Sequence, residues 1–307
     1  MKTALLTGIA GFLGRHIARH FAGAGWRVVG VDSLAPENVQ LGAGVRYARI
    51  KLPSPEFGAL LAEAKPDVLL HCAGRASVPL SMQDPAADFH DNTVLTFELL
   101  DAVRRNTPQC RFILLSSAAV YGNPKVLPVS ENTHVSPLSP YGFHKRQCEL
   151  VCQEFARIYS VPTVSVRIFS AYGAGLRRQV VWDICERLIT NGSLLLSGTG
   201  NESRDFIHAT DIARALALLS EKAPAEGEIY NLSTGRETTI SELAGHLIKS
   251  LGMNVIPVFD GKTRAGDPLN WRADVSKLVS LGFAPTVTLE QGLAQVASWA
   301  RAELSIA

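Results

Sequence analysis

The sequence predicts an α/β fold, in which a doubly wound parallel sheet is joined to a smaller C-terminal α/β lobe. In the first half of the chain, short runs rich in leucine and valine alternate with longer helical patterns. Parallel strands need such helical crossovers, so this alternation indicates a parallel sheet covered on both faces. Beyond about Ser170 the alternation weakens, and a helical pattern, a glycine-rich loop and a proline-punctuated tail follow.

The predicted strands lie, in chain order, at residues 4–7, 28–32, 68–72, 112–116 and 163–168. Residues 180–190 and 211–220 predict helices, and residues 229–232 predict another strand. The last helix and strand repeat the pattern of the first half, so we expect the chain to return to the sheet before it ends. The predicted division is a first domain over 1–169 with a return segment over 206–233, and a second lobe over 170–205 and 234–307.

Composition narrows the partners and the compartment. The 30 basic and 28 acidic residues nearly cancel, so neither nucleic acid nor an anionic membrane is expected as a main partner. No run approaches the roughly 20 apolar residues of a membrane span, and no leader pattern opens the chain. The five cysteines form no CxxC pair and lack metal-ligand spacing. We therefore expect a soluble cytoplasmic protein with reduced thiols and no metal site.

A glycine pattern follows the first predicted strand and opens a helix. In residues 7–14, TGIAGFLG, the glycines are Gly8, Gly11 and Gly14. They allow a tight turn and close approach of the backbone to a pyrophosphate, while the helix N-terminus at Phe12 and Leu13 offers free N–H groups to it. This context predicts a dinucleotide site.

Asp32 ends the second predicted strand, where a carboxylate can accept hydrogen bonds from an adenosine ribose. That charge would repel the 2′-phosphate of NADP, and no arginine or lysine follows it between Ser33 and Gln40. The cofactor expected is therefore NAD. Lys51 stands where sequences that resemble this one often have an aspartate near the adenine, and this departure weakens the preference for NAD.

Tyr141 and Lys145 form a candidate proton-transfer pair. Ser139 can cap a helix that begins at Pro140, which places Tyr141 and Lys145 one turn apart on the same face. A free tyrosine is a poor base near neutral pH, but a nearby ammonium favours its phenolate. The pair can therefore pass a proton while a nicotinamide passes a hydride.

Several further segments stand in a characteristic order. They are HCAG from His71, SVP from Ser77, Asn92, SSAAVYG from Ser116, RIFSAYG from Arg167 and SRDFIHATD from Ser203. With the glycine loop and SPYGFHK, their order and spacing resemble those of extended short-chain dehydrogenases/reductases, which have a Rossmann domain. The whole chain is most similar to the UDP-glucose 4-epimerase branch of the NAD-dependent epimerase/dehydratase family.

The resemblance implies a role for each matched residue. Ser117, rather than Ser116, would contact the sugar oxygen that is oxidised, Tyr141 would be the acid/base, and Lys145 would hold the nicotinamide ribose. Ala73 and Asn92 would contact the cofactor. A nucleotide diphosphate sugar would be bound by residues matched in both parts of the chain, namely Ser77, Ser170, Arg204, Arg264, Asp267 and Trp271. Arginines suit a diphosphate through charge-assisted hydrogen bonds.

The expected activity is 4-epimerisation of a nucleotide sugar, with UDP-glucose and UDP-galactose as the substrates that the branch implies. A nucleotide-4-keto-6-deoxysugar reductase is the alternative, because it needs only the same serine, tyrosine and lysine. A dehydratase would carry acid/base side chains where this chain has Ala118 and Ala119. A non-catalytic NAD-binding protein is the remaining hypothesis.

Relatives of this kind commonly form homodimers through four helices, two from each subunit. The candidates here are the helix predicted around residues 89–103 and the helix that starts at Pro140.

Overall fold

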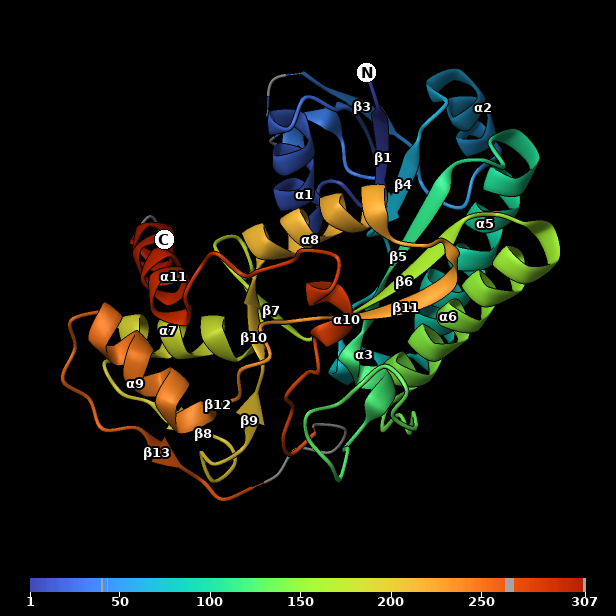
Figure 1. The fold of residues 1–307 in the computed structure, drawn as a ribbon. Coiled ribbons are helices and arrows are strands. Elements are labelled where there is room, and N and C mark those ends of the chain that lie inside the picture. Colours follow the sequence, from blue (N-terminus) through green and yellow to red (C-terminus); the bar gives the residue numbers. More distant parts are fainter. Residues whose placement is uncertain (40, 43, 263–267, 306–307) are drawn as a thin grey trace.

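The computed structural model describes residues 1–39, 41–42, 44–262 and 268–305. Its centre is a seven-stranded sheet in the order β11-β6-β5-β4-β1-β2-β3, with every neighbouring pair parallel (Figure 1). The strands are β1 (Thr3–Thr7), β2 (Arg27–Asp32), β3 (Val45–Arg49), β4 (Val68–His71), β5 (Arg111–Ser117), β6 (Thr163–Ile168) and β11 (Glu226–Leu232). The predicted doubly wound parallel sheet is confirmed.

Helices cover both faces of the sheet. On one face, α1 (Phe12–Gly23) and α8 (Ala209–Lys222) bury Ile17, Phe21 and Leu216 against the strands. On the other, α2 (Pro55–Ala64), α5 (Leu95–Asn106) and α6 (Pro140–Tyr159) bury Leu61 and Phe155. The central strands between them are buried on both sides, which explains why they read as unbroken apolar runs.

The second lobe has a core of its own, built from α7 (Gln179–Asn191), α9 (Ile240–Ser250) and α11 (Leu289–Leu304). Small two-stranded pairs join β7 (Ser170–Tyr172) to β10 (Phe206–His208), β9 (Ser203–Arg204) to β12 (Thr238–Thr239), and β8 (Leu195–Leu196) to β13 (Val258–Phe259). Between these segments the chain returns to the sheet through α8 and β11. A short helix, α10 (Ser276–Val279), packs near β11.

Two local predictions need correction. Strand β3 was not expected, because its sequence VRYAR is half exposed at the sheet edge and lacks an apolar run. The helix predicted around residues 89–103 is three consecutive pieces: α4 (Pro85–Phe89), a π-helical turn η2 (His90–Val94) and α5. Such a turn widens a helix by one residue and often marks a functional site. Helix α4 is in turn preceded by α3 (Val78–Gln83).

Within the described residues, no helix is both long enough and apolar enough to cross a membrane.

Candidate active site

The carboxyl ends of the central strands open onto a cavity of about 670 Å³, which residues of the second lobe also line. This edge is where open parallel sheets bind ligands. The cavity brings most of the predicted site residues together: Gly8, Gly11, Phe12, Leu13, Gly14, Ala73, Ser77, Ser117, Tyr141, Lys145, Ser170, Arg204 and Trp271.

The glycine loop has the geometry that a dinucleotide requires. Gly8 has a φ of 65°, and a Cβ atom there would lie 2.7 Å from the main-chain nitrogen of Ala73. A Cβ atom at Gly14 would overlap the carbonyl oxygen of Gly8. Among the described residues no side chain caps α1, so the first N–H groups of the helix are available to a phosphate. The loop therefore fits the pyrophosphate of NAD.

Asp32 lies at the end of β2, beside this loop but outside the lining of the main cavity. Its Oδ2 atom accepts a hydrogen bond from the N–H of Ala10 at 3.0 Å, and its Oδ1 atom accepts one from the N–H of Ser33 at 2.8 Å. The carboxylate thus joins the strand end to the glycine loop. Lys51 is exposed, two residues beyond the end of β3.

Asn92 is buried in the π-helical turn rather than exposed in the cavity. Its Nδ2 atom donates a hydrogen bond to the main-chain oxygen of Asp88 at 3.0 Å, whereas its Oδ1 atom has no partner among the described residues. That oxygen faces Gly74, where a Cβ atom would lie 2.8 Å from it. An unpaired buried acceptor beside the cavity loop fits a position that a bound cofactor completes.

The two serines at the end of β5 have different surroundings. The hydroxyl of Ser116 donates a hydrogen bond to Glu149 Oε1 at 2.7 Å inside the protein. The hydroxyl of Ser117 accepts one from the N–H of Ala119 at 3.2 Å, and the residue lines the cavity. The Ser117 hydroxyl still has its own proton to donate, so Ser117 is the better placed of the two to meet a substrate oxygen.

Tyr141 and Lys145 lie one turn apart on α6, as predicted. Ser139 caps this helix by accepting a hydrogen bond from the N–H of Gly142 at 3.2 Å, and Pro140 is its first residue. The Nζ atom of Lys145 lies 5.9 Å from the centre of the Tyr141 ring and donates a hydrogen bond to the main-chain oxygen of Leu115.

The charge of Lys145 acts on two neighbours, the buried His71 and the half-buried Cys72. Burial, followed by this ammonium, lowers the pKa of His71 to about 3. The neutral ring of His71 shares a hydrogen bond with the hydroxyl of Thr7 at 2.8 Å. Burial raises the pKa of Cys72 to about 12, with Lys145 opposing it. Both side chains therefore remain neutral near pH 7.

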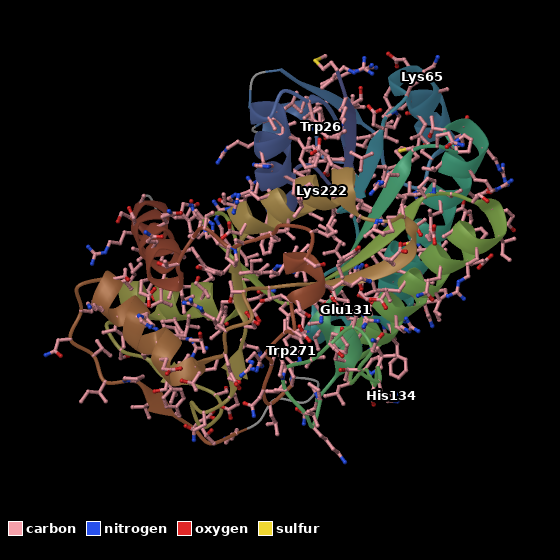
Figure 2. All side chains as sticks on the ribbon, viewed as in Figure 1. Trp26, Lys65, Glu131, His134, Lys222 and Trp271 are labelled. Atoms are coloured by element: carbon pink, nitrogen blue, oxygen red, sulfur yellow. The ribbon has the colours of Figure 1, made fainter. Side chains whose placement is uncertain are left out.

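The second lobe contributes Ser170, Arg204 and Trp271 to the cavity. The guanidinium of Arg204 donates to the main-chain oxygens of Ser203 and Leu269 and lies 5.6 Å from the centre of the Trp271 ring. The indole Nε1 atom of Trp271 donates a hydrogen bond to the main-chain oxygen of Gly122 at 3.1 Å. Figure 2 shows Trp271 between the sheet domain and the second lobe.

The segment that carries Trp271 is held by a buried carboxylate. Asp205 accepts hydrogen bonds from the hydroxyls of Ser233 and Thr234 and from the N–H of Ala273. Burial raises the pKa of Asp205, although these hydrogen bonds oppose the rise. These bonds tie the segment just after Trp271 to residues that follow β9 and β11, so both parts of the chain fix the position of the indole.

Arg264 and Asp267 lie outside the described residues. The cavity also has lining residues that the sequence did not single out, among them Arg75, Arg178 and Lys262. Arg178 donates a hydrogen bond to the main-chain oxygen of Ala76 at 2.6 Å and so joins the two lobes. In the sequence, the only local sign of a role for Arg178 was that two arginines, Arg177 and Arg178, stand directly before α7. Gln179 also lines the cavity, with a φ of 68° that non-glycine residues rarely adopt.

Other titratable residues have structural surroundings. His208 is buried, and its Nδ1 atom accepts a hydrogen bond from the N–H of Thr210 at the start of α8. Cys148 and Cys152 are buried and unpaired on α6, and burial raises the pKa of both thiols. The described residues contain no group of three or more histidine, cysteine or acidic side chains that could hold a metal ion.

Comparison with known proteins gives a consistent result. A model of the NAD dependent epimerase/dehydratase family matches residues 4–233. The UDP-glucose 4-epimerase of Mycolicibacterium smegmatis is 30% identical over 315 residues, which cover 98% of this chain and 99% of the relative.

Two solved structures share the fold over nearly their whole length. The UDP-glucose 4-epimerase of Thermotoga maritima with UDP-glucose has a TM-score of 0.90 at 29% identity, covering 98% of this chain and 99% of that one. The UDP-glucuronic acid 4-epimerase of Bacillus cereus, in complex with UDP-glucuronic acid and NAD, has a TM-score of 0.90 at 27% identity with the same coverage.

Proposed function

Because the chain belongs to the NAD dependent epimerase/dehydratase family, we propose that it is a nucleotide-sugar 4-epimerase that interconverts UDP-glucose and UDP-galactose. The observation that carries the proposal is the meeting of Ser117, Tyr141 and Lys145 with the glycine loop in one cavity. Its cofactor is NAD, which when bound accepts a hydride from the sugar and returns it.

The side chains divide the proton chemistry between them. The phenolic oxygen of Tyr141 takes the proton of the sugar 4-hydroxyl and later returns it to the same oxygen. Ser117 contributes its hydroxyl to a hydrogen bond with that oxygen. Lys145, fixed by its bond to Leu115, holds the nicotinamide ribose and keeps its ammonium facing the Tyr141 ring. Between the two proton transfers the keto sugar turns over and presents its other face.

The residues after Ser117 favour epimerisation over elimination. Ala119 lines the cavity and Ala118 is buried. A dehydratase needs an acid/base side chain at this place to move protons at the neighbouring carbons, and a methyl group cannot do so. The same argument applies to a decarboxylase that uses a glutamate there.

We assign the nucleotide diphosphate to the second lobe. In this proposal Arg204 and Arg264 hold the diphosphate, Asp267 holds the nucleotide ribose, and Ser170 contacts the sugar diphosphate. Ser77 contacts the substrate from the sheet domain. Residues 1–169 with 206–233 would then be the cofactor domain, and residues 170–205 with 234–307 the substrate lobe. A cytoplasmic location accords with the unpaired state of all five cysteines.

The decisive experiment has two steps. The purified protein is denatured, and mass spectrometry identifies the nucleotides that it releases. The native protein is then incubated with UDP-glucose without added cofactor, and UDP-galactose is measured by NMR. Bound NAD with cofactor-independent turnover is the expected result. An empty protein that oxidises NADPH with a 4-keto-6-deoxysugar nucleotide would establish the reductase instead, and no turnover with any nucleotide sugar would leave a non-catalytic NAD-binding protein.

A further inference from the structure

We propose that Asp88 and His144 form a positioning pair. The pair fixes helix α6, which carries Tyr141 and Lys145, relative to the π-helical turn η2, which carries Asn92. The Oδ2 atom of Asp88 lies 2.6 Å from the Nδ1 atom of His144. A carboxylate can only accept, so Nδ1 of the imidazole carries the hydrogen. As a claim about turnover, the inference rests on the proposed epimerase activity.

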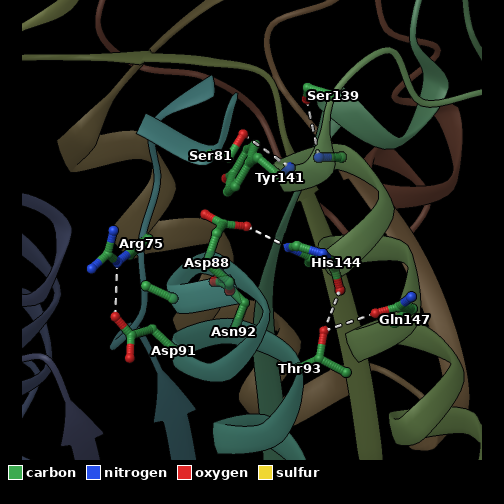
Figure 3. A network of polar contacts seen from close by, with 12 residues as sticks. Arg75, Ser81, Asp88, Asp91, Asn92, Thr93, Ser139, Tyr141, His144 and Gln147 are labelled. Carbon is green, nitrogen blue, oxygen red and sulfur yellow. Dashed lines mark hydrogen bonds and ion pairs between the residues drawn. The ribbon is translucent and has the colours of Figure 1, made fainter. Parts of the chain in front are cut away.

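Each partner stands next to a residue of the site. The main-chain oxygen of Asp88 accepts the hydrogen bond from Nδ2 of Asn92, and Asp88 belongs to α4, directly before the π-helical turn. His144 belongs to the first turns of α6, between Tyr141 and Lys145 (Figure 3). The pair therefore joins the segment that orients Asn92 to the segment that orients Tyr141.

Further contacts make the two segments one unit. The hydroxyl of Thr93 contacts the main-chain oxygen of His144 at 3.4 Å and Gln147 Oε1 at 3.0 Å. The N–H of Tyr141 donates to the hydroxyl of Ser81 at 3.2 Å. In Figure 3 the Ser81–Tyr141 bond lies above the Asp88–His144 contact, and the bonds of Thr93 lie below it. Of all of them, the bond between Asp88 and His144 is the shortest.

Burial of a polar pair such as Asp88 and His144 costs desolvation free energy. The Asp88 side chain is fully buried and that of His144 is 12% exposed. The Oδ1 atom of Asp88 has no hydrogen-bond partner among the described residues. A buried pair with an unsatisfied oxygen is poor evidence for stability, because apolar side chains of similar size often replace such pairs without loss. The pair instead fixes the position and orientation of α4 relative to α6.

Asp88 and His144 are absent from the described lining of the cavity, so they act through Tyr141, Lys145 and Asn92. The ring of Phe89 packs edge-on against His144, with ring centres 5.4 Å apart, and closes that side of the imidazole. Loss of the bond would let the start of α6 shift relative to Asn92. A displacement of about 1 Å in a catalytic group can cost about a hundredfold in rate.

The test compares His144→Phe, which keeps an aromatic ring against Phe89, with His144→Asn, whose amide N–H can replace Nδ1–H. Asp88→Leu removes the acceptor and keeps the volume. We measure kcat and KM with UDP-glucose, and the affinity of the apoprotein for NAD by calorimetry. For His144→Phe and Asp88→Leu we expect kcat to fall about tenfold to a hundredfold with little change in KM, and NAD affinity to fall severalfold. His144→Asn should recover most of both.

His134→Phe and Asp101→Asn are the controls, because both residues lie outside the two joined segments and His134 is exposed. Equal values for His144→Phe and His134→Phe at unchanged melting temperature would overturn the proposal. So would a His144→Asn variant as poor as His144→Phe. If Asp88→Leu fails to fold, the two His144 variants carry the test. Asp88→Asn, whose amide oxygen can still accept the hydrogen bond from Nδ1, is expected to behave as wild type, and a loss as large as that of His144→Phe would contradict the proposal. The NAD affinity tests the pair even if UDP-glucose proves not to be a substrate.

Discussion

The ammonium nitrogen of Lys145 lies 5.9 Å from the centre of the Tyr141 ring while it donates a hydrogen bond to the main-chain oxygen of Leu115, 3.2 Å away. Leu115 belongs to the central strand β5, so the sheet itself fixes the cation that faces the tyrosine. Helix α6 carries both side chains, and the hydrogen bond to β5 fixes the position of the Lys145 ammonium.

Replacement of Tyr141 by phenylalanine should remove most turnover and leave the fold and NAD binding intact, because only the proton-transfer oxygen is lost. The expected fall in kcat is about a hundredfold to ten-thousandfold. Ser117→Ala should lose less. The control is Tyr159→Phe, which changes an exposed tyrosine at the other end of the same helix. Near wild-type kcat in Tyr141→Phe would show that another group moves the proton.

Trp271 is expected to favour plain hexoses over N-acetylhexosamines. Its indole lines the cavity, is tied to Gly122 and packs edge-on against Phe169 with ring centres 5.8 Å apart, so it cannot swing away freely. Forcing an acetamido group against it would cost about 1–3 kcal/mol by analogy with overpacking. The measurement is kcat/KM for UDP-glucose and UDP-N-acetylglucosamine in wild type, Trp271→Cys and the remote control Trp26→Cys.

If wild type handled both sugars equally, Trp271 would not restrict entry. If Trp271→Cys kept a strong preference for the plain hexose, another side chain would set it.

Asp32→Ala should weaken NAD binding and improve NADP binding. The carboxylate that would repel a 2′-phosphate is removed, while Arg49, its neighbour in the sheet register, has its Nε atom 3.3 Å from the main-chain oxygen of Ser33 and can then meet the phosphate. A change in the affinity ratio of about tenfold corresponds to about 1.4 kcal/mol. Calorimetry with both cofactors measures it, and Arg49→Gln in the same background should reverse the gain.

Glu149→Gln should destabilise the fold by about 3–5 kcal/mol, because it leaves a buried guanidinium without its counter-charge. Glu149 binds Arg167 through both oxygens at 2.9 and 2.8 Å, and the two side chains are 0% and 1% exposed. Burial opposes the charge of Arg167, but the hydrogen bonds and charge of Glu149 raise its pKa overall. Urea unfolding tests this, with Glu221→Gln of the exposed Lys2 pair as a control that should change stability by less than about 1 kcal/mol.

The protein is expected to be a homodimer through α5 and α6, which lie side by side in Figure 1. Phe97 on α5 and Leu150 on α6 are 44% and 48% exposed, so these two helices offer apolar surface to a second subunit. Light scattering should give the dimer mass for wild type and the monomer mass for a Phe97→Glu, Leu150→Glu double variant. Ile256→Glu, at an 85% exposed site of the second lobe, should leave the mass unchanged. A wild-type monomer at micromolar concentration would contradict the expectation.

The sequence predicted an element where the segment itself carries a clear pattern of apolar residues, and missed it where the segment does not. The central strands were found because they are buried on both faces and read as apolar runs, whereas β3 was missed because an edge strand such as VRYAR is half exposed. The π-helical turn was also missed, since residues 90–94, HDNTV, contain no proline or glycine to mark a break.

By itself, the sequence determined the parallel sheet, the glycine loop and the placing of Tyr141 and Lys145 on one helical face. The sheet follows from the alternation of strand and helix patterns along the chain, and the other two follow from spacing within a short segment. Only the tertiary structure decided that Ser116 turns inward to Glu149, that Asp88 meets His144 across 56 positions of sequence, and that Trp271 reaches Gly122 across 149. Such contacts join elements far apart along the chain. Packing of whole helices and strands sets their distances, and no local pattern of residues records it.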